Sequence, residues 1–225
     1  MRTVAVVPSY EEEGSVGRTV SSLLAIPGVD EVVVIDDYST DLSAREAAGE
    51  GATVVVNGAN LGKGGSLNRV LPHLEFDFLL LVDGDLGDSA REAEMILAPV
   101  LAGEADLAIA AFGPARRKGG FGIAQGLGGM AIRMLAGGVM ASPLSGQRAM
   151  THRTYERVAP FEEGFGVEVG MTVDALRAGL KVVEVETGMY HRETGRDLAG
   201  FKHRGRQFLD ILRSALKRLF QSGGI

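Results

Sequence analysis

The feature that most constrains the fold is a regular alternation, over the first half of the chain, of short apolar segments with amphipathic ones. Five runs rich in Val, Ile and Leu predict strands at residues 3–7, 31–35, 52–56, 78–82 and 106–110. Helical patterns lie between them, at residues 15–25, 43–49, 64–74 and 91–101. Because such strand–helix–strand units form parallel sheets with helices on both faces, the sequence predicts an α/β fold with a mostly parallel central sheet.

The pattern changes after residue 111. Residues 113–129 are rich in glycine and predict a long loop, and an apolar helical stretch follows to residue 139. Further on, strands are expected at 145–150 and 181–185, and helices at 167–178 and 200–220. A chain of 225 residues suits one sizeable α/β domain. We therefore expect a single domain over 1–225, divided into a first half at 1–111, a variable half at 112–199 and a C-terminal helix at 200–225.

Composition excludes several classes of protein. The formal charge of −6 argues against general nucleic-acid binding, which normally requires a basic excess. The absence of cysteine excludes disulfides and thiolate metal sites. The N-terminus lacks the pattern of a signal peptide, and no segment approaches the roughly 18 continuous apolar residues of a membrane-spanning helix. A cytoplasmic protein is expected, with any membrane contact peripheral at the inner face.

Two aspartates directly follow the apolar run at residues 78–82. That run predicts a strand buried on both faces, so Asp83 and Asp85 emerge at its carboxyl edge, where open α/β sheets bind ligands. Two carboxylates one residue apart are costly unless a positive group lies between them, and a divalent cation with a bound diphosphate is the usual solution. Asp-Gly-Asp is also a good turn sequence, so its surroundings must decide between the two interpretations.

Three other predicted strands lead into polar segments of the same kind. These are Pro8-Ser9-Tyr10-Glu11-Glu12-Glu13, Asp36-Asp37-Tyr38-Ser39-Thr40-Asp41 and Asn60-Leu61-Gly62-Lys63-Gly64-Gly65. Singly, each has a structural explanation, such as a turn, a helix N-cap or an exposed lysine. Because parallel strands end at one edge of a sheet, their order along the chain favours a single ligand site built from all four segments.

In this order the segments resemble those of the family-2 glycosyltransferases, which have the GT-A fold. The resemblance is close over about the first 112 residues and continues more weakly to about residue 191. It implies a donor site for a UDP- or GDP-hexose, with Asp37 holding the base or ribose and Lys63 facing the diphosphate. The donor-binding residues implied at the first four strand ends are Pro8, Tyr10, Glu12, Asp37, Gly62, Lys63 and Asp83. Glu11 and Tyr38 depart from the family pattern, which usually has asparagine and glycine there.

The second half is similar to the glucosyl-3-phosphoglycerate synthases and to bacterial enzymes close to them. The stretches that carry this similarity are Pro143-Leu144-Ser145-Gly146-Gln147, Gly164-Phe165-Gly166-Val167-Glu168-Val169-Gly170 and His191-Arg192. The resemblance implies that Gly146 belongs to the donor site, that Glu168 contacts the donor sugar, and that His191 joins Asp85 and Asp83 around Mg²⁺ or Mn²⁺. The alternative for His191 is a surface histidine in a basic tail. Glu168 lies within an apolar helix and needs a partner if it is buried.

The acceptor is less defined, because the acceptor loop typical of those synthases is absent. Arg116 and Arg117, and also Arg192 and Arg196, are candidates for binding an acidic acceptor. Residues 192–220 carry eight Lys and Arg against three Asp and Glu, and their apolar side chains recur at helical spacing. This pattern predicts a basic amphipathic helix that lies on a membrane, on the domain or on a second copy of the chain as a homodimer.

The expected activity is transfer of a hexose from a nucleotide sugar to a phosphorylated acceptor, either polyprenyl phosphate or a small metabolite such as phosphoglycerate. Asp85 and Glu168 are the expected catalytic residues, with the metal on Asp85 neutralising the leaving diphosphate. Two alternatives remain. A sugar-1-phosphate nucleotidyltransferase would carry a Gly-x-Gly-x-Arg loop after the first strand, which this chain lacks. A non-catalytic nucleotide-sugar-binding protein would not need the intact aspartates.

Overall fold

The computed structural model describes residues 1–112, 121–162 and 166–190. In this part of the chain seven strands form one sheet, in the order β3-β2-β1-β4-β6-β5-β7. The strands are β1 (Thr3–Ser9), β2 (Glu31–Asp36), β3 (Thr53–Val56), β4 (Phe78–Leu81), β5 (Leu107–Phe112), β6 (Arg148–Thr151) and β7 (Val182–Thr187). All of the strands predicted from the sequence are present, with small shifts at their ends.

The sheet is parallel except at β6, which runs antiparallel between β4 and β5. Leu81 at the end of β4 is therefore paired with Arg148 at the start of β6. Because an antiparallel strand begins at the edge where its neighbours end, the segment before β6 reaches the carboxyl edge of β4. The expectation of a mostly parallel sheet is confirmed.

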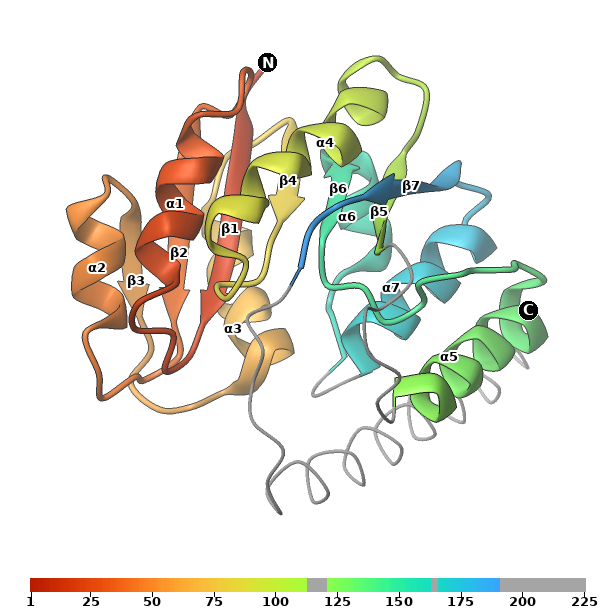
Figure 1. The fold of residues 1–225 in the computed structure, drawn as a ribbon. Helices are drawn as coiled ribbons and strands as arrows, with labels where there is room; N and C mark the ends of the chain where they lie inside the picture. Colours follow the sequence, from red (N-terminus) through yellow and green to blue (C-terminus); the bar gives the residue numbers. More distant parts are fainter. Residues whose placement is uncertain (113–120, 163–165, 191–225) are drawn as a thin grey trace.

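Helices cover both faces of this sheet (Figure 1). One face carries α1 (Val16–Leu24), α2 (Ser43–Gly49), the 3-10 helix η2 (Gly87–Ala93) and α4 (Glu94–Leu101). The other carries α3 (Gly62–Val70), the 3-10 helix η1 (Leu71–His73), α6 (His152–Val158) and α7 (Gly166–Arg177). A further helix, α5 (Phe121–Ala136), packs on α7 through a small cluster that contains Ile132, Val169 and Val173.

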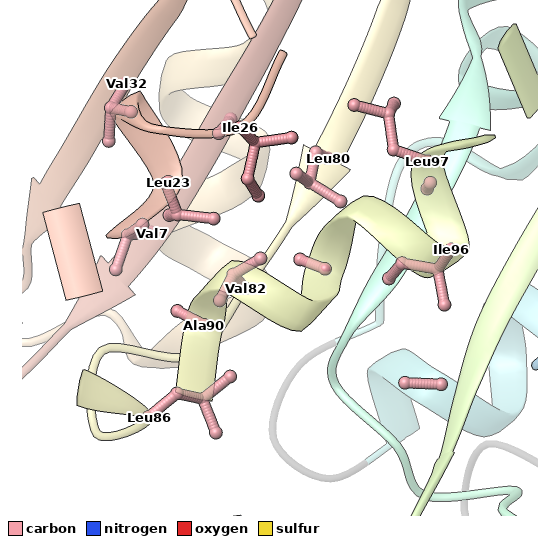
Figure 2. Packing of buried hydrophobic residues seen from close by; sticks show 14 of the residues in the cluster. Val7, Leu23, Ile26, Val32, Leu80, Val82, Leu86, Ala90, Ile96 and Leu97 are labelled. Atoms are coloured by element: carbon pink, nitrogen blue, oxygen red, sulfur yellow. The ribbon is translucent and has the colours of Figure 1, made fainter. Parts of the chain in front are cut away.

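Alternation along the strands divides the core into two layers. In β4, Leu80 contributes to the cluster under α1 and α4, whereas Leu79 and Leu81 contribute to the cluster under α3 and α7. Figure 2 shows the first of these clusters, where Leu80 and Val82 lie with side chains of α1 and α4. A strand buried on both faces is the structure that the continuous apolar run predicts.

Several boundaries differ from the prediction. Residues 113–129 are not one loop, because α5 begins at Phe121. The glycines of its first turns do not break this helix, and one of them has a packing role, since a Cβ on Gly128 would lie 3.2 Å from Leu144. The sequence analysis also missed α6, which Thr151 caps by accepting a hydrogen bond from the amide of Thr154 at 3.2 Å.

The C-terminal helix predicted at 200–220 lies outside the described residues. Among the residues that are described, no helix is both long and apolar enough to cross a bilayer.

Candidate active site

The polar segments predicted to converge do so at the carboxyl edge of β1, β2 and β4. The antiparallel strand β6 and the first turn of α7 complete this edge from the second half of the chain. Lys63 is the residue that links the two halves, because it stands in the first turn of α3 and contacts carboxylates from both.

The centre of the site is an ion triad of Lys63, Asp83 and Glu168. Lys63 Nζ lies 2.7 Å from Asp83 Oδ1 and 3.0 Å from Glu168 Oε1. Burial alone would lower the pKa of Lys63, but the two carboxylates outweigh it and raise that pKa well above its usual value of 10.5. The lysine therefore stays charged over the whole physiological range. Glu168 is only 8% exposed, so the partner that the sequence analysis required for it is Lys63.

Gly146 and Gln147 close the triad from the β6 side. Gln147 Nε2 donates to Asp83 Oδ2 at 3.0 Å, so both oxygens of this carboxylate have a partner. The backbone of Gly146 passes so close that a Cβ there would overlap Lys63 Nζ and Asp83 Oδ2. Any other residue at this position would push the ion pair apart, which is the physical reason for glycine in this segment.

Asp37 is buried behind the triad, and its carboxylate organises the segment that leads to Lys63. Its Oδ1 accepts from Asn57 Nδ2 at 2.7 Å and from the amide of Leu61 at 2.8 Å, and its Oδ2 accepts from the amide of Gly62 at 2.7 Å. Gly62 has a φ of 71°, a conformation that favours glycine. Asp37 thus holds the start of α3, and its predicted contact with a base or ribose stays a prediction.

The loop after β1 lies against the Asp83–Asp85 segment, because a Cβ on Gly84 would be 3.3 Å from Glu12 Cγ. Pro8 is half-buried and Tyr10 is 51% exposed. The amide of Glu12 donates to Ser43 Oγ at 2.7 Å, and Glu12 Oε2 accepts from Ser15 Oγ at 3.1 Å. These bonds tie the loop to the N-terminal ends of α1 and α2.

Asp85 follows Asp83 of the ion triad by two residues. It lines a pocket of about 270 Å³ together with residues of α1, η2 and the segment after β7; the other lining residues are Ser15, Arg18, Leu86, Gly87, Asp88 and Tyr190. Thr19 fixes the Asp85 loop, because its Oγ1 donates to the Gly84 carbonyl at 2.9 Å and accepts from the Gly87 amide at 2.8 Å.

Ser89 joins this pocket to the end of the described chain. Its Oγ donates to the carbonyl of Tyr190 at 3.2 Å and accepts from the amide of the same residue at 3.3 Å. The chain after β7 is thereby held beside Asp85, immediately before His191. His191 itself lies outside the described residues, as do Arg116, Arg117, Arg192 and Arg196.

The residues at Asp85 suit a hard cation, since carboxylate oxygens are the preferred ligands of Mg²⁺ and are good ligands of Mn²⁺. Within the described ranges no three His, Asp or Glu side chains cluster closely enough to hold a metal ion. A cation at Asp85 would therefore complete its shell with at most one further described carboxylate, such as Asp83, and with ligand oxygens or side chains from outside these ranges.

Arg148 is a charged residue of this region that the sequence analysis missed. It is only 1% exposed, and burial lowers the pKa of Arg148 to about 10 against the opposing effect of Glu168, Glu184 and Asp83. The available signal was a lone arginine in the strand predicted at 145–150, since an arginine must find polar partners when it is buried.

The geometry offers a carboxylate that lines a pocket and a half-buried lysine flanked by two carboxylates. Such an arrangement can bind a polyanion through the lysine and a cation, and can hold hydroxyl groups on the carboxylates. A lysine and a cation that bind a diphosphate, with carboxylates that bind hydroxyl groups, suit the transfer of a group from that diphosphate to an acceptor.

Comparison with known proteins agrees with this assessment. The family described as Glycosyl transferase family 2 matches residues 4–138. The chain is 34% identical to the glucosyl-3-phosphoglycerate synthase of Mycolicibacterium smegmatis, over 95% of this chain and 77% of that one. It is 29% identical to the glycosyltransferase AglJ of Haloferax volcanii, over 93% of this chain and 71% of that one.

The structure superposes on that of glucosyl-3-phosphoglycerate synthase from Mycobacterium tuberculosis in complex with Mn²⁺, uridine diphosphate and phosphoglyceric acid. The TM-score is 0.80 and the identity 26%, with 96% of this chain and 78% of that chain covered. This likeness confirms the GT-A fold expected from the sequence. With a family match over more than half of its length and relatives aligned across nearly all of it, the chain belongs to glycosyl transferase family 2 and is a glycosyltransferase.

Proposed function

We propose that the protein transfers a hexose from a UDP-sugar to a small phosphorylated acceptor, with a divalent cation at Asp85. The observation that carries this proposal is the Lys63–Asp83–Glu168 triad, assembled beside the Asp85 pocket. The structurally similar synthase binds Mn²⁺, uridine diphosphate and phosphoglyceric acid, which supports uridine as the base and phosphoglycerate as the first acceptor to test.

Each residue at the edge has a role in this proposal. Asp85, together with Asp83 and His191, would hold Mn²⁺ or Mg²⁺, and the bound cation would neutralise the charge that develops on the departing diphosphate. Lys63 would offer its Nζ to the same diphosphate, because its raised pKa keeps it charged. Glu168, held by Lys63 at 3.0 Å, would accept hydrogen bonds from the sugar hydroxyls.

Pro8, Tyr10 and Glu12 would frame the nucleotide, and Asp37 would hold its base or ribose. The acceptor would enter beside Arg116 and Arg117 or beside Arg192 and Arg196, since guanidinium groups bind phosphate in a bidentate manner. The basic excess of residues 192–220 in an otherwise acidic chain supports a phosphorylated acceptor. Contact of this tail with a membrane or with a second copy of the chain stays a prediction.

The test compares Asp85→Ala with Asp88→Ala. Both aspartates line the same pocket, but Asp88 is exposed and its ion pair with Arg18 Nη1 is long, at 3.8 Å. We expect Asp85→Ala to lower Mn²⁺-dependent transfer from UDP-glucose by at least about 100-fold, a loss of about 2.7 kcal/mol of transition-state stabilisation. Asp88→Ala should keep activity within about threefold. Transfer is measured as released UDP, with 3-phosphoglycerate and a polyprenyl phosphate offered in parallel.

A thermal-shift panel of UDP- and GDP-sugars with and without Mn²⁺ fixes the donor independently of the acceptor, because a ligand bound only by the folded protein raises its stability. Equal activity of the two alanine variants would contradict the role of Asp85. A wild-type protein that responds to GDP-sugars alone would overturn the assignment of uridine.

A further inference from the structure

The charged side chain of Arg148 is buried in the sheet, where desolvation of a charge is unfavourable. Arg148 starts β6, paired with Leu81 of β4 on one side and Ile109 of β5 on the other, and is 1% exposed. Taking a guanidinium out of water costs several kcal/mol unless hydrogen bonds and opposite charges compensate it. An arginine kept at such a place therefore needs a reason beyond packing.

Its contacts lead to the triad. Arg148 Nε donates to the carbonyl of Ser145 at 2.9 Å, and Nη1 donates to Thr172 Oγ1 at 2.9 Å. Thr172 is buried on α7, and its Oγ1 in turn donates to the main-chain carbonyl of Glu168 at 2.9 Å. A chain of two hydrogen bonds therefore connects Arg148 to Glu168. Arg148 Nη2 has no hydrogen-bond partner among the described residues.

Glu168 is thus held from two directions. Lys63 binds its carboxylate from the donor half, and the Arg148–Thr172 pair binds its main chain from the second half. The two cations and the two carboxylates of this group, Lys63, Arg148, Asp83 and Glu168, balance in charge. If Lys63 turns toward a diphosphate, Arg148 remains as the buried positive charge behind Glu168.

We propose that Arg148 and Thr172 are positioning residues that hold the first turn of α7, and with it the carboxylate of Glu168, at the donor end of the site. This inference rests on the proposed function, in which Glu168 contacts the donor sugar. It adds that the correct placement of Glu168 depends on a hydroxyl one helical turn away, beneath the surface and out of reach of any substrate.

The test removes that hydroxyl with Thr172→Val, which keeps the shape of the side chain. Thr154→Val is the matched control, because Thr154 is equally buried and its Oγ1 donates to a main-chain carbonyl, that of Asp106, at 3.0 Å, but on α6. We expect Thr172→Val to lower kcat about tenfold with the acceptor KM unchanged, and Thr154→Val to change neither. Thr172→Ser, which retains the hydroxyl, should restore most of the loss.

A double-mutant cycle with Glu168→Gln separates positioning from packing. If the hydroxyl acts through Glu168, Thr172→Val has an effect within about twofold in the Glu168→Gln background, because the two changes are not additive. Full additivity, or equal impairment by Thr172→Val and Thr172→Ser, would overturn the inference. Should Thr172→Val fail to fold, Thr172→Ser against Thr172→Ala gives the same comparison.

Urea unfolding of the same four proteins provides a readout that does not depend on sugar transfer. The shift of the urea midpoint caused by Thr172→Val should be smaller in the Glu168→Gln background than in the wild type. A coupled unfolding cycle without any transfer or UDP-sugar binding by the wild type would mean that the proposed function fails while the link between Thr172 and Glu168 stands. Uncoupled unfolding in an active enzyme would mean the reverse.

Discussion

β2 and β4 both run into a pair of acidic residues at the same edge of the sheet, and the protein uses the two pairs differently. Asp37, after β2, accepts three hydrogen bonds from Asn57, Leu61 and Gly62, two of them from main-chain amides. Asp83, after β4, is bound by the side chains of Lys63 and Gln147. The Asp37 carboxylate thus fixes the main chain at the start of α3, whereas the Asp83 carboxylate is part of the charged group that surrounds Lys63.

The difference teaches how this edge is organised. Main-chain amides cannot move away from Asp37 without unwinding the start of α3, so that carboxylate is fixed by the fold. Asp83 is held by side chains alone, and that of Lys63 is still 24% exposed, so Lys63 can turn from Asp83 to a ligand without any change in the main chain. Changes at β2 should therefore affect stability first, and changes around β4 should affect activity first.

The strongest challenge to this comparison is Gly146→Ala. The added methyl group would displace Lys63 and Asp83 from each other while leaving every strand intact, so we expect kcat/KM to fall about 100-fold, or about 2.7 kcal/mol. The control is Gly49→Ala, where a Cβ meets nothing within 4 Å and alanine should be neutral or slightly stabilising. An active Gly146→Ala enzyme would show that the ion pair is not needed in the form seen here.

Lys63→Met tests the charges themselves. It leaves Asp83 and Glu168 without their shared cation, and we expect a loss of about 2 kcal/mol in the free energy of unfolding, since all three side chains are largely shielded from water. The pKa of Lys63 is higher in the folded state than in the unfolded one. The stability that the charged lysine contributes is therefore complete below about pH 10.5 and is lost as the pH rises through the folded-state pKa. Urea unfolding should therefore show the same deficit at pH 7 and pH 9.5. A deficit that disappears by pH 9.5 would contradict the raised pKa.

Among these changes, Asp37→Asn should have the smallest direct effect on activity, because the Asp37 carboxylate holds main-chain amides of the fold. An amide cannot accept at both of its ends, so at least one of the donors from Asn57, Leu61 and Gly62 loses its partner, at a cost of about 1.5 kcal/mol in stability. Asp83→Asn keeps an acceptor for Lys63 and should cost less stability but more activity. Finding the opposite order in paired unfolding and transfer assays would reverse the assignment of the two carboxylates.

Much of this edge was predictable, because the order of polar segments after apolar strands is a property of the sequence alone. The need of Glu168 for a partner was predictable, since a buried carboxylate requires one, but the identity of that partner as Lys63 was not. The sequence could not show that Asp37 binds main-chain amides whereas Asp83 binds charged and polar side chains. Both are aspartates at a strand end, and their partners are decided by which loops fold over them.

The errors have physical causes of the same type. The start of α5 was missed because four glycines between Gly122 and Gly129 argue against a helix, and their effect is outweighed by packing on α7. Arg148 was missed because one charge in a four-residue strand carries no periodicity. Helix α6 was missed, although Thr151 gives a recognisable N-cap signal.

The antiparallel placement of β6 also has a consequence for the folding of the protein. Asp83 and Gln147 are separated by 64 positions along the chain, and they meet only when β6 enters between β4 and β5. Contacts of such long sequence separation form slowly, because the loop between them must first be closed. A nascent chain that has completed only β1 to β4 carries both aspartate pairs but no Gly146, Gln147 or Glu168 beside them. The active-site edge can therefore be complete only after the chain as far as Glu168 has folded against the first half.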